Sequence, residues 1–234
     1  MKTAVLVILI LILLVIIFSG IFLLYSKKEG RAQKAAKGLC LLLVPLFTTF
    51  FGVYVALYLD REDRREVQIN TAESVLNLCD IEVFQIIEQF EVPFNMHKDN
   101  PKFSEGGFGF FLQRHFANHG YPFPVYTEEL IQRDVVLEQT THAFKNEVLL
   151  EFVKIRNCKL YIENVEDNEA LSRYYFTYRA HLYFLLALIQ DQRVYLKGEV
   201  SKDKSDEFIR YNHDQFLKNR DKYMNDLLKM VETP

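Results

Sequence analysis

Two long stretches without a charged residue, both near the start of the chain, limit its fold more than any other feature of the sequence. They cover residues 4–25 and 38–59, and each is 22 residues long. A helix of that length rises about 33 Å, at ~1.5 Å per residue, whereas the hydrocarbon core of a bilayer is ~30 Å thick. The sequence therefore predicts two transmembrane helices.

The first stretch has an alternative interpretation as a secretory signal peptide that is cleaved after export. Its apolar run is longer than the roughly 7–15 residues typical of such a signal. The small pair Ser19 and Gly20 is preceded by Ile17 and Phe18, where a cleavage site has a second small residue. We therefore expect the stretch to be retained.

A short basic loop, residues 26–37, joins the two stretches and predicts a tight helical hairpin. Its basic residues are Lys27, Lys28, Arg31, Lys34 and Lys37. Four Lys and Arg residues near the other span ends, with the terminal amine, balance this loop, so the positive-inside rule leaves the orientation open. The density of charge in the loop slightly favours a cytoplasmic loop and an exported domain.

Behind the spans, the residues predict a mainly α-helical soluble part. Apolar residues recur every three or four positions over 60–92, which indicates a juxtamembrane helix that ends before Pro93. The helical soluble domain then covers 93–234 and begins with a loop rich in proline and glycine, 93–109.

Further helices are expected within this domain. Thr127 is the predicted N-cap of one of them, and residues 157–167 are expected to be irregular or a brief strand. The last helix, over about 204–231, is expected to bury one face, made of Phe208, Tyr211, Phe216, Tyr223, Leu227 and Met230. The fold class is therefore mainly α: an N-terminal transmembrane hairpin followed by a small all-α domain.

The charge of the soluble part argues against direct nucleic-acid binding. Residues 60–234 hold 22 basic and 30 acidic residues. Such a surface repels phosphate groups instead of releasing their counterions.

Small residues on the second span indicate a contact between helices. Thr48, Gly52 and Ala56 are spaced by four and share one helix face, which allows close approach of two backbones. The contact is either an oligomer interface or packing within the hairpin against Ser19 and Gly20. We expect a homo-oligomer embedded in the lipid bilayer.

No motif in the chain points to an enzyme, a metal site or a cofactor. His115 and His119 share a helix face, but no further ligands accompany them. The glycine-rich 105–109 lacks the Lys-Ser/Thr of a phosphate loop and is expected to be a flexible turn. The aromatic and aliphatic stretch 171–191 is expected to be the central core helix, with a partner groove as the alternative.

These features resemble a family of bacterial defence proteins. Two tight N-terminal spans, the charged exit Asp-Arg-Glu-Asp-Arg-Arg-Glu at 60–66 and a small helical domain look like the transmembrane effectors encoded beside some retron reverse transcriptases. The Arg-, Tyr- and Phe-rich stretch 173–189 is similar to the core helix of abortive-infection proteins.

The resemblance implies an anti-phage toxin that perturbs the bacterial inner membrane. It also implies control by a reverse transcriptase with its RNA–DNA hybrid, which places the soluble domain in the cytoplasm, although a periplasmic domain stays open. No catalytic residue is carried over. The alternative is a non-toxic, membrane-anchored scaffold or receptor subunit that binds another protein through its helical domain.

Overall fold

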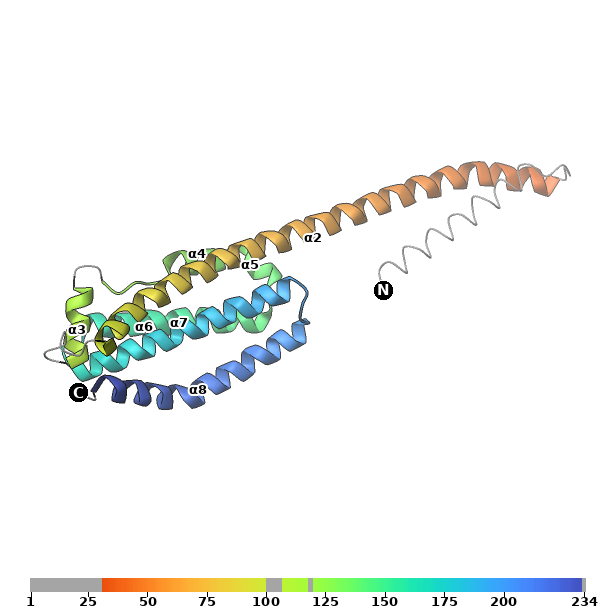
Figure 1. Ribbon diagram of the computed structural model, residues 1–234. Helices are drawn as coiled ribbons and strands as arrows, with labels where there is room; N and C mark the ends of the chain where they lie inside the picture. Colours follow the sequence, from red (N-terminus) through yellow and green to blue (C-terminus); the bar gives the residue numbers. More distant parts are fainter. Residues whose placement is uncertain (1–30, 100–106, 118–119, 233–234) are drawn as a thin grey trace. The chain divides into compact units, whose positions relative to one another are not determined.

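The computed structural model describes residues 31–99, 107–117 and 120–232, and all regular structure in them is α-helical. The helices are α2 (Arg31–Asp99), α3 (Gly107–Phe116), α4 (Val125–Ile131), α5 (Asp134–Gln139), α6 (His142–Asn164), α7 (Asn168–Leu196) and α8 (Lys202–Glu232) (Figure 1). The chain divides into two compact units, residues 1–66 and 67–234.

The membrane hairpin predicted from the sequence is wrong for the described part of the chain. In residues 31–99, 107–117 and 120–232, no helix has a stretch both long and apolar enough to cross a membrane. The predicted span 38–59 is instead one part of α2, which runs on without a break through seven consecutive charged residues, 60–66. The other predicted span, 4–25, lies outside the described residues.

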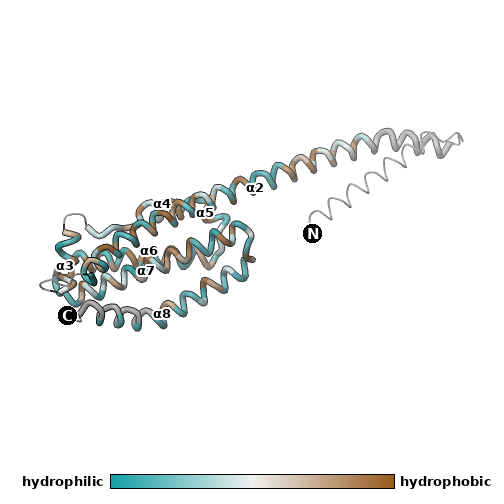
Figure 2. The backbone as a smooth tube through the Cα atoms, in the orientation of Figure 1, coloured by the Kyte–Doolittle hydropathy of each residue, from teal (hydrophilic) through white to brown (hydrophobic). Residues whose placement is uncertain are grey.

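The predicted inner-membrane localisation rested on the same hairpin and is corrected with it. Along the described part of α2, apolar and polar residues follow one another within a single helix (Figure 2). The fold class that the described residues support is all-α, without a membrane hairpin.

Helix α2 begins earlier and ends later than predicted. It starts at Arg31, within the expected loop 26–37, and continues past Pro93 to Asp99. A proline inside a helix removes one backbone hydrogen bond. Packing compensates, because the buried ring of Phe94 makes edge-on contacts with Phe108 and Phe176, at centroid distances of 6.5 and 5.8 Å.

Two local predictions in the second unit are also wrong. Helix α6 runs on to Asn164, through the expected irregular stretch, because Cys158 and Ile162 are buried on its inner side. Thr127 is not the N-cap of α4, which begins two residues earlier. Its buried hydroxyl donates to Glu82 of α2 at 2.6 Å, and Glu82 also accepts the backbone N–H groups of Tyr126 and Thr127.

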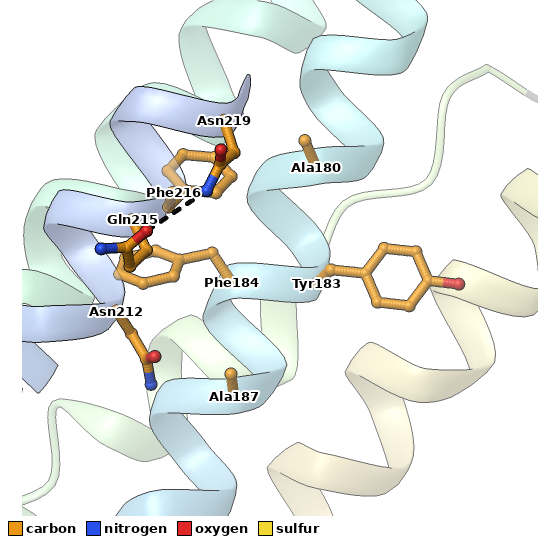
Figure 3. A pocket seen from close by; sticks show the side chains of 8 residues that line it. All are labelled: Ala180, Tyr183, Phe184, Ala187, Asn212, Gln215, Phe216 and Asn219. Atoms are coloured by element: carbon orange, nitrogen blue, oxygen red, sulfur yellow. Dashed lines mark hydrogen bonds between the residues drawn. The ribbon is translucent and has the colours of Figure 1, made fainter. Parts of the chain in front are cut away.

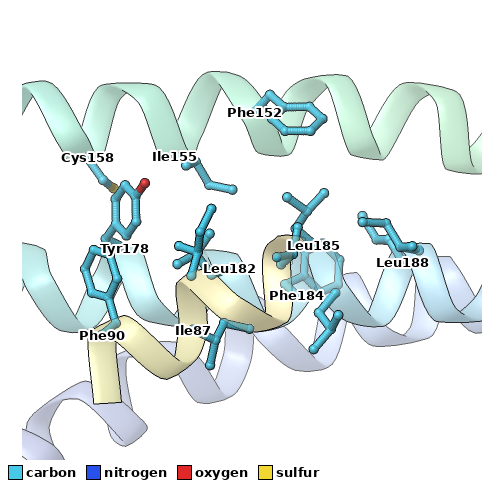
Figure 4. Close-up of a cluster of buried hydrophobic side chains, with 14 of the residues drawn as sticks. Ile87, Phe90, Phe152, Ile155, Cys158, Tyr178, Leu182, Phe184, Leu185 and Leu188 are labelled. Carbon is cyan, nitrogen blue, oxygen red and sulfur yellow. The ribbon is translucent and has the colours of Figure 1, made fainter. Parts of the chain in front are cut away.

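Helix α7 is the centre of the hydrophobic core, as predicted for 171–191. It buries side chains on every face, among them Leu171, Tyr175, Phe176, Tyr178, Leu182, Leu185 and Ile189. The ring of Phe90 in α2 stacks on Tyr175, with centroids 5.3 Å apart. It also stacks on Tyr178, with centroids 4.7 Å apart (Figure 4). The two tyrosine hydroxyls donate to the backbone carbonyls of Phe90 and Pro122, respectively.

Helix α3 lies so close to the start of α7 that only glycine fits at the contact. A Cβ atom on Gly109 would lie 2.1 Å from the backbone oxygen of Asn168. Gly107, with φ of +88°, opens α3 in a conformation that glycine adopts readily. Residues 107–109 are therefore part of a packed helix and not the flexible turn that the sequence predicts.

Candidate interaction groove

An open groove of about 520 Å³ runs between α7 and α8. Both helices contribute four residues to its lining: Ala180, Tyr183, Phe184 and Ala187 from α7, and Asn212, Gln215, Phe216 and Asn219 from α8 (Figure 3). The groove belongs entirely to the second unit.

The floor of the groove is made by small residues on α7 and by a pair of stacked rings. Ala180 and Ala187 are seven residues apart, so they lie on the same side of α7 two turns from each other. Between them, Phe184 stacks on Phe216 of α8 with ring centroids 4.9 Å apart and an interplanar angle of 15°. The floor is therefore apolar, and the alanines leave room above it.

The α8 wall of the groove is a row of amides. Asn212, Gln215 and Asn219 are spaced by three and four residues, which places them on one flank of α8. The side-chain nitrogen of Asn219 donates to the oxygen of Gln215 at 3.4 Å (Figure 3). Each amide has hydrogen-bond donors and an acceptor, so this wall can both donate hydrogen bonds to neutral polar groups and accept hydrogen bonds from them.

The opposite edge of the groove is formed by Tyr183, whose side chain points away from α8 and towards α2 (Figure 3). Its hydroxyl donates to Glu91 at 2.8 Å, and Glu91 also pairs with Arg179. Partial burial, together with the hydrogen bond to Glu91, raises the pKa of Tyr183. The phenol thus stays neutral at physiological pH.

A buried hydrogen-bonded pair, His181 and Glu151, lies next to the floor of the groove. Nδ1 of His181, on α7, is hydrogen-bonded to Oε1 of Glu151, on α6. Lys154 pairs with the second carboxylate oxygen of Glu151 at 3.1 Å. The ring of His181 lies against Phe216, with centroids 5.2 Å apart. This contact fixes the position of Phe216, which closes the groove on its α8 side.

The side chains that line the groove are aliphatic, aromatic or amide groups, and the phenol of Tyr183 is hydrogen-bonded to Glu91. Among the eight residues that line it there is no carboxylate, thiol, aliphatic hydroxyl or imidazole. Nucleophilic and general acid–base catalysis depend on such groups within reach of the substrate.

The site residues proposed from the sequence lie in the first unit. Thr48, Gly52 and Ala56 are on α2, and a Cβ atom on Gly52 would meet no described atom within 4 Å. The first-span residues Ser19 and Gly20, the alternative packing partners, lie outside the described residues. The choice between an oligomer interface and packing within the chain therefore stays open.

The basic loop is divided by the start of α2. Arg31, Lys34 and Lys37 belong to this helix, and Lys27 and Lys28 lie outside the described residues. Of the two histidines considered as metal ligands, His115 packs on Phe116 with centroids 4.9 Å apart, and His119 is outside the described residues.

The sequence only partly indicated the groove. The stretch 171–191 was expected to form the core, with a partner groove as the alternative; α7 forms the core and also contributes four residues to the lining of the groove, whereas binding of a partner there stays a prediction. The amide row on α8 was missed, because Phe208 and Tyr211 were assigned to its buried side. They are 46% and 60% exposed, and α8 buries Ser205 and Ile209 instead.

Comparison of the chain with protein-family models, with curated proteins and with solved structures gives no match. The resemblance to retron-associated effectors therefore stays a prediction.

Proposed function

We propose that this chain is a non-enzymatic interaction protein whose second unit binds a helical segment of a partner protein in the groove between α7 and α8. The observation that carries the proposal is the lining of the groove: an apolar floor with two alanines, a stacked aromatic pair and a row of three amides. An amphipathic helix commonly binds by laying its apolar face into such a groove.

The open shape of the groove favours a helix over a small metabolite. Small-molecule sites enclose most of the surface of their ligand, whereas this groove is open and is lined by residues of two helices only. The exposed Phe208 lies one turn before Asn212 on α8 and offers an apolar side chain next to the row of amides.

Site-specific photo-crosslinking tests this proposal. A photoreactive residue at position 212, on the α8 wall of the groove, should form a covalent adduct with the partner in cells, and its fragments should map to one helical segment. The Ala187→Trp variant should abolish capture, because an indole fills the space above the floor. Leu150→Trp, on an exposed position of α6, is the matched control and should leave capture intact.

Loss of capture with both tryptophan variants would point to misfolding. Capture that survives Ala187→Trp would contradict the proposal.

The anti-phage effector function implied by the resemblance stays a second prediction, and a separate experiment addresses it. The chain is expressed in bacteria without its neighbouring genes, and growth is followed. Growth arrest that the neighbouring genes relieve would support the effector function. Normal growth would contradict the effector function and leave the interaction role as the remaining proposal.

A further inference from the structure

A second surface, on the outer side of α2 in the second unit, is independent of the groove. Its residues alternate in spacing between four and three: Val67, Thr71, Ser74, Leu78, Ile81, Gln85, Glu88 and Val92. All eight are exposed, and the four large apolar ones are between 46% and 63% exposed. We name this row the α2 seam.

The spacing of the α2 seam is that of a coiled coil. Helices that repeat apolar residues every 3.5 positions pair along that row, because each residue packs into a hole on the facing helix. The inner face of the same helix has its own partners, since Leu76, Val83, Ile87 and Phe90 are buried against the rest of the unit. The seam is therefore a second, outward face for which the described chain supplies no cover.

We infer that the α2 seam pairs with the α2 seam of a second copy of this chain, in antiparallel orientation. In this arrangement the two α2 helices run in opposite directions, and the two-fold axis lies midway between Leu78 and Ile81. Apolar residues then oppose apolar residues and polar residues oppose polar residues in every layer. The opposed pairs are Val67 with Val92, Thr71 with Glu88, Ser74 with Gln85, and Leu78 with Ile81. Two apolar layers lie at the centre of the pair, and one further apolar layer lies at each end. The polar layers lie between the centre and the ends.

The charges also favour the antiparallel pairing. A parallel pairing would place Glu88 against Glu88 of the other copy, and like charges at a pairing position are unfavourable. The antiparallel pairing places Glu88 opposite the hydroxyl of Thr71. Along the flanks, it sets Asn77 beside Phe84 and Gln68 beside Gln89, so no like charges meet there.

This self-association goes beyond the proposed partner groove, because it uses another helix face and another partner. The same helix can use both faces at once: the inner face completes the bundle, and the outer face joins two bundles. In the dimer, the apolar seam residues of both copies are removed from water, and this burial drives the association.

Sedimentation of the purified full-length chain at micromolar concentration tests the association. We expect a dimer, and the double variant Leu78→Glu/Ile81→Glu should raise the dimer dissociation constant by about a hundredfold or more, because it places charges in both central layers. The matched control is Leu149→Glu/Leu160→Glu on α6, whose residues are similarly exposed and should leave the dimer unchanged. Unchanged helicity of both variants confirms that they fold.

Cysteine crosslinking tests the orientation. In a Cys40→Ser background, in which the remaining Cys79 and Cys158 are buried, the antiparallel pairing predicts a disulfide-linked dimer for the double variant Val67→Cys/Val92→Cys. Neither single variant should form one. A monomer in sedimentation, a dimer that resists Leu78→Glu/Ile81→Glu, or disulfide-linked dimers of the single variants would each overturn the inference.

Discussion

Helices α7 and α8 are neighbours in the chain and similar in length, 29 and 31 residues, but they are held in place in different ways. Helix α7 buries aromatic and aliphatic side chains on every face, and two of its tyrosines are hydrogen-bonded to backbone carbonyls of other segments. Among the described side chains of α8, only Ser205 and Ile209 are fully buried.

Among the described residues of α8, the buried Ile209, a few polar contacts and one stacked ring hold the helix in place. His213 pairs with Glu147 of α6 at 2.8 Å, Ser205 donates to Asp191 at 2.5 Å, and Phe216 stacks on Phe184. Packing therefore fixes α7, whereas α8 rests on contacts that are individually weak. The two walls of the groove differ accordingly: the side chains of α7 are buried more completely than the described side chains of α8.

The largest expected effect is the loss of a buried ring from α7. Tyr178→Ala should lower the free energy of unfolding by about 3–5 kcal/mol, because it leaves a cavity beside Phe90 and removes a hydrogen bond. Leu217→Ala, at an exposed position of α8, should change it by less than about 0.5 kcal/mol. Urea unfolding of the full chain measures both. Equal losses would show that the two helices do not differ as proposed.

A smaller loss is expected where α3 approaches α7. Gly109→Ala should destabilise the second unit by about 1–3 kcal/mol, because the added methyl group overlaps the backbone of Asn168. Gly52→Ala in α2 meets no described atom and should be neutral, or stabilise the helix by up to about 1 kcal/mol. Thermal unfolding followed by circular dichroism compares the two. If Gly109→Ala lowers stability no more than Gly52→Ala does, α3 and α7 do not approach each other as closely as described.

Alkaline pH should act on α7 through its buried phenols. Burial raises the pKa of Tyr175 and of Tyr178 above the ordinary value. A raised pKa contributes stability that is fully present below the unfolded pKa of ~10 and is lost as pH rises above it, by up to about 1.4 kcal/mol per pH unit and group.

The Tyr178→Phe variant tests this pH dependence. It removes one of the two phenols, so stability should fall less steeply between about pH 10 and 11 than in the wild type. Urea titrations at each pH give the slope. Burial also raises the pKa of the Cys79 thiol on α2, to about 12, so this residue adds a slope of the same sign that is common to both proteins. Parallel slopes for variant and wild type would refute the assignment.

The smallest expected effect is the loss of a polar contact of α8. His213→Ala removes a single, partly buried contact with Glu147 and should cost about 1 kcal/mol overall. Hydrogen exchange should nevertheless accelerate along α8, and along α7 it should stay unchanged, because local opening needs less energy than global unfolding. Acceleration in both helices would indicate that they open as one unit.

The contrast between the two helices also explains what the sequence could reveal. A helix that is apolar on every side has one stable place, the core, so the burial of 171–191 followed from its composition. In α8 apolar residues are few, and the buried face is decided by Glu147 on α6 and Asp191 on α7. Spacing within α8 does not disclose those partners.

Local propensity rules failed where tertiary contacts outweighed them. Pro93 was expected to end α2, but the rings around Phe94 keep the helix intact. The groove itself needed two helices in register, with Ala187 of one beside Asn212 of the other, and no pattern within either segment specifies that register.

The carboxylate of Glu82 has a consequence for the order of folding. It accepts hydrogen bonds from the backbone of Tyr126 and Thr127, the first turn of a seven-residue helix more than forty residues further along the chain. An isolated helix that short is not stable in water. As the nascent polypeptide leaves the ribosome, α2 emerges first and can serve as the template on which α4 nucleates.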